Sequence, residues 1–345
     1  MSSIPRINWK AIPQTSWHKI YVGVVLLFTF YLLANTARSY NGSKKFHDVL
    51  ATPAWDRPAL LQRPGTSRLV RTLEGNERRY QETILKRALV IEKEGGKYIV
   101  PFPPPRSKFY VLWDFFIPAF TCPFPTYRVG TLVEGGLWVC GLERVLNSRP
   151  KPIVYSLNYA TPAYSSFEQD MLRRSPGCEI YGFDANATAI GALRWPWGDA
   201  NNMQSDARVH FNKFGIADNN ATQYRSLDSV MKHFGHDFVD ILRIDLEGGE
   251  FPVLTSMIAD NGDKPLPFGQ LLLEFHVGWS EDMSTVDKFS KWWERLERAG
   301  LRPFYFEISM MDVNNMRKEP AVVYFSFINI RGRHALLDDS LPEYP

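Results

Sequence analysis

Three carboxylates stand within six residues of one another in the string Asp245-Leu-Glu-Gly-Gly-Glu250. The apolar run 238–245 before them predicts a buried strand, so Asp245 ends that strand and Glu247 lies in the following loop. Carboxylates are costly to place together unless they are solvated, bind a cation or orient a polar substrate. We therefore expect Asp245 and Glu247 to be catalytic residues. Glu250 is explained by the favourable electrostatics of an acid at a helix N-terminus.

Glu274 and His276 end the next predicted strand, 270–276. The carboxyl ends of neighbouring parallel strands meet at one edge of a sheet, so we expect both residues beside the Asp245 loop. An imidazole there could take a proton from a nucleophilic substrate, which makes His276 a third catalytic candidate, although a structural histidine is the simpler explanation. The chain has no Cys-x-x-Cys or His-x-x-x-His spacing, so we predict no metal site.

A further acid, Asp184, ends the predicted strand 179–184. An acid at this position can accept hydrogen bonds from both hydroxyls of an adenosine ribose, and the alternative is a helix N-cap. After the predicted strand 208–211, the loop Gly215-Ile-Ala-Asp218 is placed to border an adenine ring. Asp218 could equally be a turn residue.

These residues need a scaffold, and from Pro152 onward short apolar strands alternate with helices. This alternation implies right-handed crossovers and an α/β, Rossmann-like sheet that is mostly parallel and covered on both faces. The last two strands look like a closing antiparallel hairpin. The predicted strands are 153–157, 179–184, 208–211, 238–245, 270–276, 302–308 and 321–330, and the predicted helices are 165–174, 227–234, 251–259 and 285–299.

Composition and charge point to a membrane edge. With 345 residues, 45% hydrophobic and 22% charged, the chain is globular, which excludes wholesale disorder, a collagen-like repeat and a polytopic membrane protein. The first 50 residues hold six Lys/Arg and one acid, so the rest of the chain is slightly acidic. This basic excess flanks the uncharged run 20–34, which favours a bilayer partner over nucleic acid. We predict one transmembrane helix at 20–37, with a cleaved signal peptide as the alternative.

The predicted layout follows from these segments: a cytosolic tail 1–19, the anchor 20–37, a stem 38–75, an N-terminal extension 76–151 packed on the main domain, the main domain 152–332 and a tail 333–345. A helix is predicted over 76–94, ended by Gly95-Gly96. The flanking basic residues number three on each side of the anchor, so orientation stays open.

Sequons and cysteines bear on the compartment. Three N-glycosylation sequons, at Asn41, Asn186 and Asn220, suit a catalytic part in the lumen of the endoplasmic reticulum or Golgi better than one in the cytosol. Cys122 and Cys140 could pair in such an oxidising lumen. Cys178 starts an apolar strand and is expected to be buried.

Many short strings, each weak alone, occur here in an order that resembles methyltransferase-domain proteins of the methyltransferase-like-24 group, and more distantly FkbM-type methyltransferases. The resemblance covers roughly residues 120–330. Its strings are Cys122-Pro, Val129-Gly-Thr131, Glu134–Gly141, Tyr155-Ser-Leu157, Ser165–Glu168, Pro176–Asp184, His236–Gly249, Leu266–His276, Trp292-Trp-Glu294, Ala299–Pro303 and Tyr324–Asn329.

The resemblance implies a class I methyltransferase sheet that binds S-adenosylmethionine, usually on a single membrane anchor. Asp184 would be the ribose ligand, Asp245 and Glu247 would lie near the methyl donor, and the segment from Tyr155 to Asn158 would border the cofactor. Similar proteins read Tyr-Ser-Phe-Gly after the first strand, whereas residues 155–162 here contain no glycine. Asn158 tolerates a left-handed backbone, so binding remains compatible with this loop.

The leading hypothesis is a membrane-anchored, S-adenosylmethionine-dependent methyltransferase. It would act on an oxygen or nitrogen nucleophile of an unknown small-molecule, glycan or protein substrate, and not on nucleic acid. A second hypothesis, motivated by the missing glycines, is a scaffold protein that keeps the fold without the cofactor. A third is a membrane-anchored glycosyltransferase, for which Asp245-Leu-Glu247 is the only near match to an Asp-x-Asp motif.

Overall fold

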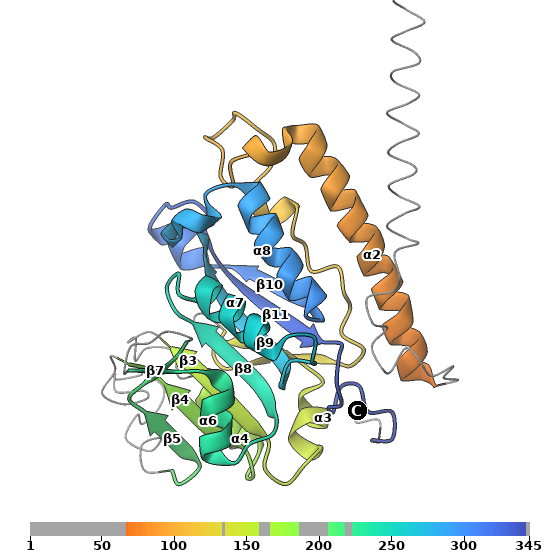
Figure 1. Cartoon of the computed structure of the whole chain (residues 1–345), viewed down its shortest axis with the longest axis vertical. Coiled ribbons are helices and arrows are strands. Elements are labelled where there is room, and N and C mark those ends of the chain that lie inside the picture. The colour runs from red at the N-terminus through yellow and green to blue at the C-terminus, as the bar shows by residue number, and fades with distance from the viewer. Residues whose placement is uncertain (1–66, 133–134, 159–165, 186–205, 218–222, 343–345) are drawn as a thin grey trace, which may run out of the picture. The chain divides into compact units, whose positions relative to one another are not determined.

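The computed structural model describes residues 67–132, 135–158, 166–185, 206–217 and 223–342 (Figure 1). The chain divides into two units, Met1–Asp56 and Arg57–Pro345, and the described residues all belong to the second. The predicted anchor 20–37, the sequons and Asp218 lie outside the described residues. Within the described residues, no helix has both the length and the apolar character needed to cross a bilayer.

A seven-stranded sheet forms the centre of the described part of the chain, in the order β10-β11-β9-β8-β3-β4-β5. Strands β5, β4, β3, β8 and β9 run parallel to one another, and β11 runs antiparallel to both β9 and β10. The mostly parallel sheet and the antiparallel closing pair are therefore confirmed. The strands are β3 (Ile153–Asn158), β4 (Glu179–Phe183), β5 (Val209–Asn212), β8 (Val239–Asp245), β9 (Phe268–His276), β10 (Leu301–Ile308) and β11 (Val322–Asn329).

The strand order reverses between β3 and β8. Successive strands β3, β4 and β5 proceed toward one edge of the sheet, whereas β8 and β9 proceed toward the other. In open α/β sheets, ligands bind outside the carboxyl ends of the strands at such a switch point. We therefore expect the candidate residues at the ends of β3, β4, β8 and β9 to lie at one site.

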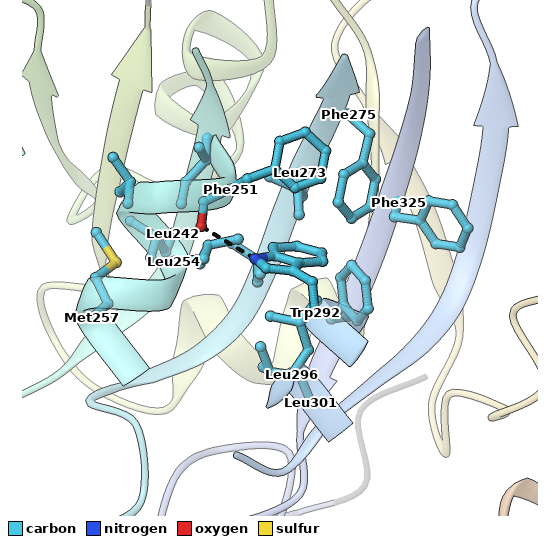
Figure 2. Packing of buried hydrophobic residues seen from close by; sticks show 14 of the residues in the cluster. Leu242, Phe251, Leu254, Met257, Leu273, Phe275, Trp292, Leu296, Leu301 and Phe325 are labelled. Atoms are coloured by element: carbon cyan, nitrogen blue, oxygen red, sulfur yellow. Dashed lines mark hydrogen bonds between the residues drawn. The ribbon is translucent and has the colours of Figure 1, made fainter. Parts of the chain in front are cut away.

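Three helices, α6 (Leu227–Phe234), α7 (Glu250–Asn261) and α8 (Val286–Arg298), pack on one face of the sheet (Figure 1). Figure 2 shows this core around Phe275 of β9, which lies near Phe251 of α7 and Trp292 of α8. The indole Nε1 of Trp292 donates to the backbone oxygen of Phe251 over 3.2 Å. This bond gives the buried indole N–H a partner and joins α8 to α7.

The opposite face is covered by α3 (Leu142–Asn147), α4 (Ser166–Arg174) and the hairpin of β1 (Thr126–Val129) and β2 (Leu137–Cys140). The hairpin is held to β9 by Gln270, whose side-chain amide donates to and accepts from the backbone of Cys140 at 3.0 and 2.8 Å. Cys140 is also disulfide-bonded to Cys122, the pairing that the sequence suggested, and Cys178 is buried as expected. A two-stranded pair of β6 (Gly215–Ile216) and β7 (Tyr224–Arg225) completes the described strands.

The long helix α2 (Arg68–Glu94) begins earlier than predicted. Its first turn is capped by Ser67, whose hydroxyl accepts from the Val70 N–H at 3.1 Å, so residues 68–75 of the predicted stem are helical. The helix ends before Gly95, as predicted. It is joined to α8 by Glu297, which accepts from the Tyr80 hydroxyl at 2.6 Å and pairs with Arg87 at 2.8 Å.

Residues 333–342, which belong to the predicted tail 333–345, pack on the described part of the chain. Leu336 and Leu337 are both buried in the core on the α3 side of the sheet. Arg144 of α3 donates to the backbone oxygens of Ala335 and Pro342, each at 2.7 Å. One buried guanidinium therefore fixes this segment.

Candidate functional site

A row of polar residues crosses the sheet at the carboxyl ends of its parallel strands. Asn158 is in register with Asp245, and Tyr324 is in register with both Glu274 and Glu307. Asp245 and Glu274 occupy corresponding positions on β8 and β9, because they directly follow Ile244 and Leu273, which are paired with each other. From one edge toward the other, the row is Asp184, Asn158, Asp245, Glu274, Tyr324 and Glu307.

Asp245 is the central carboxylate of this row and is only 6% exposed. Arg243 lies two residues earlier on the same face of β8, with Nη2 at 3.2 Å from Asp245 Oδ2. Burial and the nearby charge of Glu274 raise the pKa of Asp245 to about 7, although Arg243 and His276 oppose the shift. The sequence-based expectation that Asp245 lies in a charged cluster with Glu274 is thus met.

Arg243 links Asp245 to a second buried acid, Glu168 of α4. Arg243 Nη1 lies 3.4 Å from Glu168 Oε1, and the same oxygen accepts from the Ser156 hydroxyl at 2.6 Å. The other oxygen of this carboxylate, Oε2, is buried without a hydrogen-bond partner among the described residues. Sequence reasoning missed both Arg243 and Glu168. The available signal was an arginine inside a buried strand, between the apolar residues Leu242 and Ile244.

The imidazole of His276 stands between two carboxylates. Nδ1 lies 3.6 Å from Glu250 Oε1 and Nε2 lies 3.5 Å from Glu274 Oε1, while the Trp279 ring packs against the imidazole with centroids 5.1 Å apart. Burial opposes a charge here, but the two carboxylates prevail and raise the pKa of His276 to about 10. In this arrangement the imidazole is charged near neutral pH. Its predicted role as a proton acceptor therefore requires that its surroundings change first.

Glu250 is a positioning residue that the sequence analysis undervalued. It is fully buried as the first residue of α7. Its Oε2 accepts from the Gly248 N–H at 2.7 Å, and its Oε1 accepts from the His276 N–H at 2.6 Å. Beyond its place at a helix N-terminus, this carboxylate ties the loop after β8 to the end of β9. The loop itself holds Glu247 half-buried at φ 49°.

Two of the predicted cofactor residues lie at the expected strand ends. Asp184 directly follows β4 and is buried, with its backbone N–H donating to the Asn212 oxygen at 3.1 Å. Asn158 ends β3 beside Asp245 by backbone register.

Tyr155 is placed differently from what a cofactor role would need, and Gly215 has a packing role of its own. The Tyr155 hydroxyl bonds to Nδ1 of His236 at 2.7 Å, and His236 precedes β8, so this side chain is directed toward the amino-terminal edge of the sheet. Tyr155 is a core residue, and its assignment to the cofactor loop is corrected. A Cβ on Gly215 would lie 2.6 Å from the Tyr224 ring, so packing explains this glycine.

Comparison with known proteins identifies the family of the chain. A family model described as a methyltransferase domain matches residues 103–324, more than half of the chain. The chain belongs to this methyltransferase-domain family. The match confirms the resemblance on which the methyltransferase and S-adenosylmethionine expectations were based, whereas the FkbM-type likeness stays a prediction.

Curated relatives include the probable methyltransferase-like protein 24 of Homo sapiens and of Rattus norvegicus. The human protein is 27% identical over 168 residues, which is 44% of this chain and 42% of the relative. The rat protein is 29% identical over 147 residues, which is 37% of this chain and 36% of the relative. The chain thus spans less than half the length of the curated relatives it matches.

Solved structures similar to the chain include the METTL16 methyltransferase domain, at 9% identity and a TM-score of 0.32 over 80% of this chain and 97% of that one. The plantazolicin methyltransferase BpumL in complex with SAH is 9% identical, with a TM-score of 0.26 over 54% of this chain and 79% of that one.

Proposed function

We propose that this chain transfers a methyl group from S-adenosylmethionine to an oxygen or nitrogen nucleophile. The observation that carries the proposal is the polar row at the carboxyl ends of β4, β3, β8 and β9, at the switch point of a methyltransferase-domain sheet. When bound, S-adenosylmethionine supplies an electrophilic methyl group on a sulfonium. The protein then has to bind and orient the two reactants and to exclude water. Much of the rate enhancement of a two-substrate reaction arises from this positioning.

The described residues fit this cofactor on two grounds. Asp184 is a buried acid at the end of β4 and would accept hydrogen bonds from ribose hydroxyls. Glu168 Oε2 is a buried acceptor beside β3 without a partner in the described chain, and it would suit the ammonium group of the methionine part. Arg243 orients Asp245, which with Glu274 would hold the acceptor near the methyl donor.

Calorimetric titration of the full-length chain in detergent, with S-adenosylmethionine and then with S-adenosylhomocysteine, tests the proposal. We expect saturable binding that weakens at least tenfold in Asp184→Ala, because the ribose hydroxyls lose a charged acceptor worth about 1.5–3 kcal/mol. Asp260→Ala removes an exposed acid from α7 and should bind as the wild type does. Absence of binding in a folded wild-type chain would refute methyl transfer and favour the cofactor-free scaffold.

We also propose that residues 20–37 anchor the chain in a membrane with its catalytic part in the lumen. The uncharged run 20–34 supports the anchor, and the Cys122–Cys140 disulfide supports an oxidising compartment. Extraction at alkaline pH should leave the chain in the membrane pellet, and endoglycosidase treatment should increase its mobility. Release into the soluble fraction would refute the anchor. A glycan on Asn186 would contradict the placement of a cofactor at Asp184, two residues away.

A further inference from the structure

Asp245, Glu274 and His276 form a cluster whose geometry suits a metal ion. One ligand atom from each residue lies within 4.8 Å of the other two, and the three residues come from the ends of the adjacent strands β8 and β9. Ligand atoms bound to one ion at about 2.0–2.2 Å can be at most about 4.4 Å apart. Three atoms around one ion cannot all stand at this limit, so small rotations of these side chains would have to bring the atoms closer together to complete the coordination.

The histidine distinguishes this cluster from an ordinary group of surface acids. His276 is 5% exposed, and its Nδ1, which lies on the Glu250 side at 3.6 Å, has no hydrogen-bond partner in the described part of the chain. Nε2 faces Glu274 Oε1 at 3.5 Å, beyond the usual length of a hydrogen bond, so the imidazole points into the cluster without being satisfied by it. A metal ion bound here would displace the proton that the two carboxylates hold on this imidazole, and a metal is the ligand that imidazole and carboxylate share.

The charge balance of the network also favours a bound cation. Asp245, Glu274, Glu250 and Glu168 are four carboxylates within one connected network, in which Arg243 pairs with two of them and the imidazole of His276 faces the other two. Buried carboxylates that outnumber their cations are expensive, because each desolvated charge needs an opposite one. A divalent cation between Asp245 and Glu274 would relieve this excess.

We propose that Asp245, Glu274 and His276 bind one divalent first-row metal ion, for which Mn²⁺ is the test ligand. This replaces the sequence-based expectation of no metal site, which considered only spacings within one segment. A set of one imidazole and two carboxylates suits such an ion better than Ca²⁺, which prefers all-oxygen sites. Three protein ligands leave positions open for water or for an acceptor, as in catalytic metal sites. That second role rests on the proposed methyl transfer, and it favours acceptors with two neighbouring oxygens.

Titration of the full-length chain with Mn²⁺ alone, followed by electron paramagnetic resonance, tests the site. The wild type should remove one equivalent of the free-ion signal, and Glu274→Gln should weaken this binding at least tenfold, since even residues behind the ligands contribute about 10–100-fold to metal affinity. Glu274 is partly exposed and the change preserves its shape, so the fold should persist; circular dichroism checks this. Asp260→Asn on α7 is the matched control and should bind Mn²⁺ normally.

The proposal is overturned if the folded wild type binds no Mn²⁺, or if Glu274→Gln binds it as tightly as the wild type. In that case the cluster neutralises itself, with Arg243 on Asp245 and a charged His276 on Glu274. Calorimetry with S-adenosylmethionine on the same preparation separates the two proposals. Mn²⁺ binding without cofactor binding keeps the metal site and refutes methyl transfer, and the converse result refutes the metal site alone.

Discussion

Replacing Glu250 by alanine should destabilise the protein more than most single substitutions. The wild-type carboxylate is fully buried and accepts from two backbone N–H groups, those of Gly248 at 2.7 Å and His276 at 2.6 Å. Alanine leaves the buried His276 donor and the part-buried Gly248 donor without this acceptor, and each such donor costs up to about 1–3 kcal/mol. Removing one carboxylate from a cluster rich in acids offsets part of this loss. We expect the free energy of unfolding to fall by about 2–5 kcal/mol.

Glu250→Gln refines the prediction because it preserves the shape of the side chain. The amide oxygen can still accept from one N–H, but the amide nitrogen places a donor against the other. The loss should therefore be intermediate, about 1–3 kcal/mol. Urea unfolding of the full-length chain in detergent, followed by tryptophan fluorescence, measures both variants. Glu281→Ala, an exposed glutamate, should change stability by less than about 0.5 kcal/mol. A loss below about 1 kcal/mol for Glu250→Ala would refute the positioning role.

Three further predictions use the same unfolding assay. Replacing both Cys122 and Cys140 by serine opens a loop with a sequence separation of 18 and should lower the free energy of unfolding by about 3 kcal/mol. If a reductant does not destabilise the wild type, the disulfide is not formed. Glu297→Gln should lower the free energy of unfolding by about 3–5 kcal/mol because it leaves Arg87 buried without its carboxylate. Glu294→Gln is the control on the same helix, with a side chain that is 46% exposed, and equal effects of the two changes would refute the buried pair. Burial lowers the pKa of His334 to about 4 in the folded protein, below its ordinary 6.5, so unfolding takes up a proton between these values and stability falls as pH drops from 6.5 toward 4. The difference in the free energy of unfolding between pH 7.5 and pH 5.0 should be smaller by about 2 kcal/mol in His334→Gln. An unchanged pH dependence would contradict a buried, neutral His334.

The parallel core of the fold could be predicted because each strand and helix there buries a continuous apolar face. The predicted strands and helices from residue 153 onward agree with the structure to within a few residues, and β8 illustrates why: all seven of its residues are buried. Elements that depend on distant partners were not accessible in this way. The hairpin β1–β2 has strands of four residues and is held by Gln270, which lies 130 residues from Cys140. Likewise, Arg144 orders residues 333–342 although no periodicity marks them.

At the site, sequence reasoning succeeded where the position of a residue followed from the end of a strand. Asp245, Glu274 and His276 lie together because β8 and β9 are parallel neighbours that end at the same edge. It failed where the direction of a side chain decided the outcome. Tyr155 stands on the correct strand, but its neighbour Ser156 is the residue that reaches the buried acids.

The alternation of side chains along a strand explains how one sheet carries both a dry core and a charged site. On β8, Leu242 and Ile244 pack in the core under α6, α7 and α8, whereas Arg243 and Asp245 belong to the polar network on the opposite face. The two faces therefore respond differently to substitution. Truncating Leu242 removes apolar contacts and should lower stability, whereas changing Asp245 alters the charges available to ligands at the strand ends. A one-residue slip of β8 would exchange these faces, burying Arg243 in the apolar core, which is why the register of this strand is strongly determined.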